Sequence, residues 1–369
     1  MDYEKILSKR VQELKPSGIR KFFDIAANMK DVISLSIGEP DFKTPWAVRA
    51  AAIETLEKGR TTYTANSGLA ALRVEITRYM ERKFGLSYHP EDETLVTVGG
   101  SEAIDLCIRA FVEPGDEVLV VEPCFVAYAP IIEMMRGVPV PVETVAEESF
   151  RLTAARLREK ITKKTKLLVL PYPNNPTGGV MRKEHLEEIA EVLRGTNIMV
   201  LSDEIYAELT YTGRHVSIAS LPGMRERTIV VNGFSKAFSM TGWRLGFACG
   251  PAPVMKQMIK IHQYAIMCAP TTSQYAAIEA LRRCEENIQS MVEEYDMRRR
   301  FIVDAFNKLG LACFEPEGAF YIFPCICSTG LTSEEFCEQL LYAKHVAVVP
   351  GSAFGSCGEG YIRVSYAYS

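Results

Sequence analysis

The middle of the chain alternates short apolar segments with amphipathic ones, and this alternation constrains the fold more than any other feature. The apolar segments are rich in Val, Leu and Ile, which is typical of strands that are buried on both faces. Strands are predicted at residues 94–98, 117–121, 138–142, 166–170, 198–202, 228–231 and 245–249. Helices are predicted at residues 101–111, 127–135 and 183–193. This order predicts an α/β fold with a mostly parallel sheet flanked by helices, and the prolines of residues 138–142 favour an edge position for that strand.

A different pattern begins near Thr271. Helices are predicted at residues 271–281, 286–309 and 333–343, and strands at residues 319–323 and 361–365. These elements predict a smaller α+β domain. Two domains also suit a chain of 369 residues. We therefore expect a large domain at residues 41–280 and a small domain formed by residues 1–40 and 281–369.

Composition excludes several classes of protein. The 42 Lys and Arg residues face 46 Asp and Glu residues, so no basic excess predicts binding to nucleic acid or to an anionic membrane. No apolar run is long enough to span a bilayer, and the polar first residues do not resemble a signal peptide. The ten cysteines form no CxxC pair, so no metal site is predicted. We expect a cytoplasmic protein with buried, reduced thiols.

Polar motifs follow the predicted strands, and in open parallel sheets ligands bind beyond the carboxyl ends of the strands. Gly100 and Ser101 open a predicted helix, where free N–H groups favour an anion such as a phosphate. The alternative is an ordinary turn capped by Ser101. Asn175 lies in the proline-rich segment after residues 166–170, where its amide either faces a site or belongs to a simple turn.

Asp203 and Tyr206 follow the strand at residues 198–202. A carboxylate can pair with a cationic ring nitrogen there, and a phenol can donate a hydrogen bond to an oxyanion. The alternative is a helix cap beside a partly buried tyrosine.

Lys236 follows the strand at residues 228–231 and lies among small and apolar residues. Desolvation would lower the pKa of this lysine and free the neutral amine that imine formation with a carbonyl requires. Ser235 and Arg244 could hold a phosphate. Arg363, on the strand at residues 361–365, offers a fork that matches a carboxylate. A solvated loop around Lys236 and a surface position for Arg363 remain the alternatives.

Three motifs occur in an order that resembles the class I aminotransferases, the pyridoxal phosphate enzymes of fold type I. They are Pro-Asn-Asn-Pro-Thr-Gly at 173–178, Ser-Asp-Glu-Ile-Tyr at 202–206 and Ser-Lys-Ala-Phe-Ser-Met-Thr-Gly-Trp-Arg at 235–244. The resemblance extends from about Pro16 to the end of the chain. It implies the fold of the fold type I PLP-dependent transferases and the cofactor pyridoxal 5'-phosphate (PLP).

The resemblance also implies a role for each site residue. Lys236 would hold the cofactor as an imine and later move a proton between the substrate's Cα and the cofactor's C4′. Asp203 would keep the pyridine nitrogen protonated, while Tyr206 and Asn175 would bind the phenolic oxygen. The remaining implied positions are Gly100, Ser101, Ser235 and Arg244 at the phosphate, Phe125 on the ring, and Gly38 and Arg363 at the substrate's α-carboxylate. Asn175 is also implied in substrate binding.

Tyr63 matches a tyrosine that reaches the phosphate in the partner subunit, which implies a homodimer with shared active sites. The implied activity is a ping-pong transfer of an amino group between an L-amino acid and a 2-oxo acid, in amino-acid metabolism and biosynthesis. The family continues past residues 361–365 with one more helix. A chain that ends at Ser369 is therefore expected to be truncated or to have a reduced small domain.

The resemblance leaves the substrate open. Segments 19–24, 261–264 and 318–323 look like both the broad or aromatic aminotransferases and the N-acetyl-diaminopimelate aminotransferases. The prokaryotic aspartate branch usually carries a lysine where this chain has Ser101, although Arg20 or Lys21 could replace it. The alternatives are therefore an aspartate aminotransferase and, as a different reaction on the same scaffold, a PLP-dependent C–S β-lyase.

Overall fold

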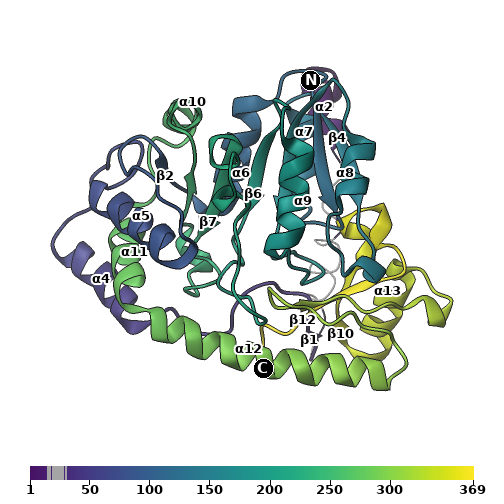
Figure 1. The fold of residues 1–369 in the computed structure, drawn as a ribbon. Helices are drawn as coiled ribbons and strands as arrows, with labels where there is room; N and C mark the ends of the chain where they lie inside the picture. The colour runs from purple at the N-terminus through teal and green to yellow at the C-terminus, as the bar shows by residue number, and fades with distance from the viewer. Residues whose placement is uncertain (15–17, 19–28, 30) are drawn as a thin grey trace.

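A seven-stranded sheet forms the centre of the computed structural model, which describes residues 1–14, 18, 29 and 31–369 (Figure 1). The strand order is β2-β8-β7-β6-β5-β3-β4. The bounds are β2 Thr94–Thr97, β3 Glu117–Glu122, β4 Val138–Glu143, β5 Thr165–Pro171, β6 Met199–Asp203, β7 Thr228–Gly233 and β8 Gly246–Cys249. Strand β8 runs antiparallel to both of its neighbours, and the other pairs are parallel. The predicted mostly parallel sheet is confirmed, with β4 at its edge.

Helices cover both faces of this sheet, because alternate strand residues point to opposite sides. Val120 packs in a core with α6, α7 and α10, whereas its neighbour Leu119 packs in a core with α8 and α9. A third core lies beneath α4, α5 and α11. The bounds are α4 Trp46–Glu57, α5 Ala70–Phe84, α6 Gly99–Phe111, α7 Tyr128–Met134, α8 Ala154–Lys160, α9 Lys183–Leu193, α10 Ala252–Ala265 and α11 Thr271–Arg283.

A smaller unit lies along the long helix α12, Glu285–Lys308 (Figure 1). Its strands are β9 Tyr321–Ile322, β11 Val349–Pro350 and β12 Ile362–Ser365, which form an antiparallel sheet, and β10 Val346–Ala347, which pairs with β1 Ile33–Ser34. Helix α13, Ser333–Lys344, begins at a capping box in which Thr332 and Glu335 satisfy each other's backbone N–H groups. The predicted smaller α+β unit is confirmed, while the domain boundaries stay a prediction.

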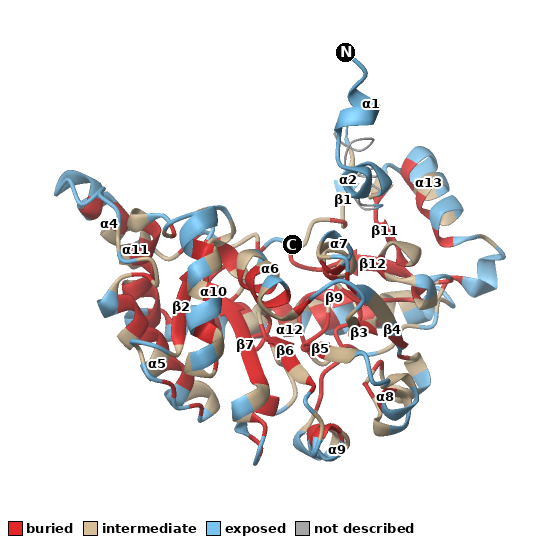
Figure 2. Cartoon of the chain, turned by 90° about the horizontal axis from the view of Figure 1, so that it is seen from above, coloured by how far each residue is buried: buried red, intermediate tan, exposed pale blue. Residues whose placement is uncertain are grey.

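Two exposed N-terminal helices project from the body of the molecule, α1 Tyr3–Ile6 and α2 Lys9–Glu13 (Figure 2). Short 3-10 helices occur at Ala146–Glu148, Ile218–Ser220, Arg225–Arg227, Thr241–Trp243, Cys327–Thr329, Gly351–Phe354 and Ser356–Gly358. None of the helices in the described ranges combines the length and the apolar character needed to cross a bilayer. All ten cysteines are free, but Cys327 is exposed, so the expectation of buried thiols was wrong at that position.

Candidate active site

A pocket of about 890 Å³ lies beyond the carboxyl ends of the parallel strands. Register brings the strand ends together, because Pro171 of β5 pairs with Asp203 of β6, and Asp203 pairs with Val231 of β7. The loops that leave these strands therefore meet at one edge of the sheet. The predicted site residues that line the pocket are Gly38, Gly100, Ser101, Phe125, Asn175, Asp203, Tyr206, Ser235, Lys236, Arg244 and Arg363.

Lys236 projects its amine into this pocket. Its Nζ donates to the carbonyl oxygen of Gly38 at 2.6 Å and lies 5.8 and 5.6 Å from the ring centroids of Tyr206 and Phe320. Burial lowers the pKa of Lys236 to about 8, and the nearby Arg363 cation adds to this effect. The neutral amine, which is the nucleophilic form, is therefore accessible near neutral pH.

Asp203 is a buried carboxylate held by hydrogen bonds. Its Oδ2 accepts from the Tyr128 hydroxyl at 2.6 Å, and its Oδ1 accepts from the Ile205 N–H at 3.2 Å. Burial raises the pKa of Asp203, and both hydrogen bonds counteract that shift. No Lys or Arg in the described ranges forms an ion pair with Asp203. A buried carboxylate without a cationic partner fits a ligand that brings its own cation, such as a protonated pyridine nitrogen.

Donors for an anion gather at the N-terminus of α6. Gly99 has φ +73°, and a Cβ there would lie 2.7 Å from Nη2 of Arg244, so glycine permits this close approach. Gly100, Ser101, Ser235 and Arg244 line the same pocket and offer backbone N–H, hydroxyl and guanidinium donors. This donor set fits a phosphate. The pocket thus combines an amine, a carboxylate and an anion site, which together match PLP.

Arg363 is buried and faces the pocket. Its Nη1 donates to Oδ1 of Asn175 at 2.9 Å, and its Nη2 donates to the carbonyl oxygen of Ser36 at 2.7 Å. The guanidinium stacks on Tyr321 and Phe354 at 4.4 and 4.9 Å, and its Nε has no partner in the described part of the chain. A fixed, partly unsatisfied guanidinium of this kind suits a carboxylate ligand.

Two tyrosines of the site were missed by the sequence analysis. Tyr128 binds Asp203, and the Tyr321 hydroxyl lies 2.9 Å from the Tyr206 hydroxyl. A Cβ at Gly38 would overlap the Tyr321 hydroxyl, so glycine is required there. Tyr128 lies three residues after Phe125, and Tyr321 lies within the segment 318–323, but only the folded chain reveals their partners.

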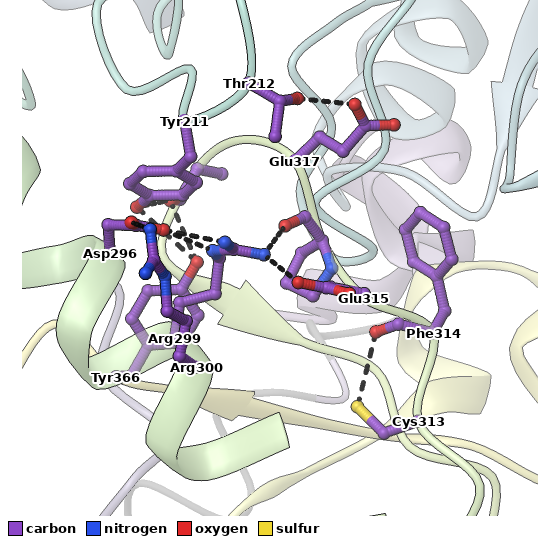
Figure 3. Close-up of polar contacts among 12 residues, drawn as sticks. Tyr211, Thr212, Asp296, Arg299, Arg300, Cys313, Phe314, Glu315, Glu317 and Tyr366 are labelled. Atoms are coloured by element: carbon purple, nitrogen blue, oxygen red, sulfur yellow. Dashed lines mark hydrogen bonds and ion pairs between the residues drawn. The ribbon is translucent and has the colours of Figure 1, made fainter. Parts of the chain in front are cut away.

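A polar network supports the segment that leads into Tyr321 (Figure 3). Arg299 of α12 binds Asp296 and Glu315 at 2.7 Å each and the carbonyl oxygen of Pro316 at 3.0 Å. The Tyr366 hydroxyl donates to the carbonyl oxygen of Ala319 at 3.2 Å. Ala319 has φ +57°, so β9 begins only at Tyr321 rather than at residue 319 as predicted.

The structure does not bring every predicted residue to the pocket. Tyr63 is 80% exposed and lies outside the pocket of the single chain. Arg20, Lys21 and the segment 19–24 lie outside the described residues.

Comparisons with known proteins agree with the chemistry of this pocket. A family model for aminotransferases of class I and II matches residues 30–369. The putative aminotransferase YugH of Bacillus subtilis is 56% identical over 98% of this chain and 94% of its own length. An aspartate aminotransferase of Pyrococcus abyssi is 48% identical over 98% of this chain and 94% of its own length. A probable N-acetyl-LL-diaminopimelate aminotransferase of B. subtilis is 45% identical over 99% of this chain and 92% of its own length. The crystal structure of an aromatic aminotransferase from Pyrococcus horikoshii superimposes with a TM-score of 0.90, over 95% of this chain and 94% of that one, and the two sequences are 45% identical.

Proposed function

The chain belongs to the class I and II aminotransferases, which are PLP-dependent transaminases, and we propose that its preferred amino donor is an L-amino acid with an uncharged, apolar or aromatic side chain. A 2-oxo acid would accept the amino group in the second half of a ping-pong reaction. The observation that carries the assignment of the site is the presence of the Lys236 amine, the buried Asp203 carboxylate and the Arg363 fork in one pocket.

PLP, when bound, supplies an electron sink for the negative charge that develops at the substrate's Cα. Lys236 would hold the cofactor through Nζ, and the same amine, once released, would serve as the base that moves the substrate's Cα proton. The lowered pKa of Lys236 supports this role, since an amine with a pKa of about 8 can both accept and release a proton near neutral pH. Asp203 would pair with the ring nitrogen and keep it protonated, and the hydrogen bond from Tyr128 favours the ionised form of Asp203 and orients it.

Arg363 orients the substrate. Its fork would bind the α-carboxylate. Its bond to Oδ1 of Asn175 fixes the orientation of that amide and leaves the NH₂ group available to donate to the cofactor's phenolic oxygen. Tyr206 would donate to the same oxygen, and Phe125 would pack on the ring. Gly100, Ser101, Ser235 and Arg244 bind the phosphate.

The charges of the pocket wall support an uncharged side chain on the donor. Among the described lining residues the cations are Lys236, Arg244 and Arg363, and each already has a role. A distal carboxylate would therefore lie without a cationic partner in this part of the chain. Isoleucines 37, 104 and 205 add apolar surface.

The names of two relatives suggest two other amino donors. Similarity to the aspartate aminotransferase of P. abyssi supports aspartate as the donor, and similarity to the probable N-acetyl-LL-diaminopimelate aminotransferase supports N-acetyl-diaminopimelate. A half-reaction screen decides among them: the loaded enzyme is mixed with single amino acids, and the bleaching of its visible absorption is recorded. Phenylalanine and tyrosine should bleach it at far lower concentrations than aspartate. The opposite order would overturn the proposed donor, and pyruvate and ammonia released from a cysteine derivative without any acceptor would indicate the C–S β-lyase.

We also propose a cytoplasmic homodimer. Ten free thiols support a reducing compartment. The Tyr63 ring is 80% exposed in the single chain, which supports a contact with a second copy.

A further inference from the structure

Glu102 places a negative charge in the first turn of α6, directly after Gly100 and Ser101. An acidic residue in the first turn suits the helix dipole. It also repels a phosphate dianion bound to the same turn, because both charges compete for one small region of positive potential. If this turn binds a phosphate, the carboxylate must be held where its repulsion of the phosphate is small.

The structure turns the carboxylate of Glu102 away from the pocket. Its Oε2 accepts from the backbone N–H of Val98 at 2.5 Å, on the strand side of the turn. Its Oε1 lies 2.7 Å from Nδ1 of His262 on α10. Gly100, Ser101 and Ile104 line the pocket, whereas Glu102 is absent from the described lining.

His262 is fully buried between α10 and α6, and its second ring nitrogen, Nε2, has no partner among the described residues. With the carboxylate ionised, Nδ1 must carry the proton and donate it to Oε1. Glu102 is therefore the one hydrogen-bond partner of the His262 side chain among the described residues.

We propose that His262 is a positioning residue for cofactor binding: it holds the Glu102 carboxylate against the Val98 backbone and so keeps negative charge out of the phosphate site at Gly100 and Ser101. The inference rests on the proposed placement of the phosphate at this turn. It predicts that a loss of the His262 bond weakens the binding of the phosphate and leaves the rest of the cofactor unaffected.

Two amide variants of His262 provide a matched test. His262→Asn places an amide nitrogen close to the position of Nδ1, whereas His262→Gln reaches toward the position of Nε2 and cannot donate to Glu102 in the same way. The affinity of each apo-protein is measured for PLP and for pyridoxal, which has no phosphate. We expect His262→Gln to lower the PLP affinity about tenfold, the scale of one lost hydrogen bond to a charged group, with pyridoxal affinity unchanged within about twofold. His262→Asn should restore most of the loss.

A double variant separates charge from packing. Adding Glu102→Gln to His262→Gln removes the negative charge. The PLP affinity should then recover, although the hydrogen bond from the imidazole of His262 is still absent. The exposed pair His89 and Asp92, at 3.1 Å, supplies a control, and His89→Gln should leave both affinities unchanged.

Equal losses for PLP and pyridoxal, or no recovery in the double variant, would overturn the proposed role and leave His262 as a packing residue. The failure of the underlying phosphate site gives a different result. If the wild-type apo-protein bound PLP no more tightly than pyridoxal, or if Ser101→Ala changed neither affinity, the placement of the phosphate itself would be wrong.

Discussion

Tyr128 donates a 2.6 Å hydrogen bond to Oδ2 of Asp203, and both side chains are buried. Burial, together with the adjacent Asp203 carboxylate, holds the pKa of the Tyr128 phenol well above its ordinary value, so the phenol stays protonated and remains a donor. This bond favours the ionised form of Asp203 against the cost of burial. The pair thus maintains a charged carboxylate at the position proposed to face the cofactor's ring nitrogen.

Tyr128→Phe removes this bond and leaves the ring in place. The pKa of Asp203 should rise further, so the carboxyl protonates at higher pH and the acid limb of the activity profile moves upward. A loss of about 1.5–3 kcal/mol corresponds to a fall of at least tenfold in kcat/KM. Steady-state kinetics across pH measure both effects.

Tyr88→Phe is the matched control, because the Tyr88 hydroxyl is buried without a hydrogen-bond partner in the described ranges. It should change neither kcat/KM nor the acid limb. An unchanged acid limb in Tyr128→Phe would refute the role of the pair.

Lys236 should react with an acylating reagent in the apo-protein with an apparent pKa near 8, since burial lowers the pKa of its amine to about that value. The neutral amine then predominates above pH 8, whereas an ordinary lysine needs a pH near 10.4. Competitive labelling with mass spectrometry follows both Lys236 and the exposed Lys256 in one sample. Identical reactivity profiles at the two lysines would contradict the buried environment.

Arg363→Lys keeps a positive charge and removes the fork. The amine cannot bind Asn175 and a carboxylate bidentately at once, so KM for the amino donor should rise at least tenfold. An amine of the same side chain without the α-carboxylate serves as the comparison substrate. If the variant lost activity equally toward both compounds, Arg363 would have no specific role at the α-carboxylate.

Tyr63→Ala should weaken PLP binding by about tenfold and leave the dimer intact, because the proposed contact of Tyr63 is with the phosphate across the interface. Sedimentation measures the oligomeric state, and fluorescence titration measures the affinity. Full PLP affinity in a monomeric preparation of the wild type would refute the shared site.

The central sheet was predictable because its strands are short, continuously apolar and separated by helix-length segments. Residues Val118 to Val121 of β3 alternate between two cores, so each of these four residues is apolar whichever face it covers. The two-residue strands β1 and β10 carry no such pattern, since they pair only after residues 33 and 346 are brought together.

The residues of the site likewise fall into a group that the sequence predicts and a group that it does not. Asp203 directly follows a predicted strand, and Lys236 and Asn175 lie in the loops that leave two others, so their convergence follows from the parallel order of these strands. Tyr128 and Tyr321 could not be assigned, because their partners are remote in sequence: 75 residues separate Tyr128 from Asp203, and 115 separate Tyr206 from Tyr321.

The central claim is that the amine of Lys236 is the attachment point of PLP. Borohydride reduction of the loaded enzyme, followed by peptide mapping, tests it directly. The account predicts one pyridoxyl phosphate group per chain, on Lys236, and a loss of this label when an amino donor is added before the reductant. A label on another lysine, or an equal label in Lys236→Ala, would contradict it.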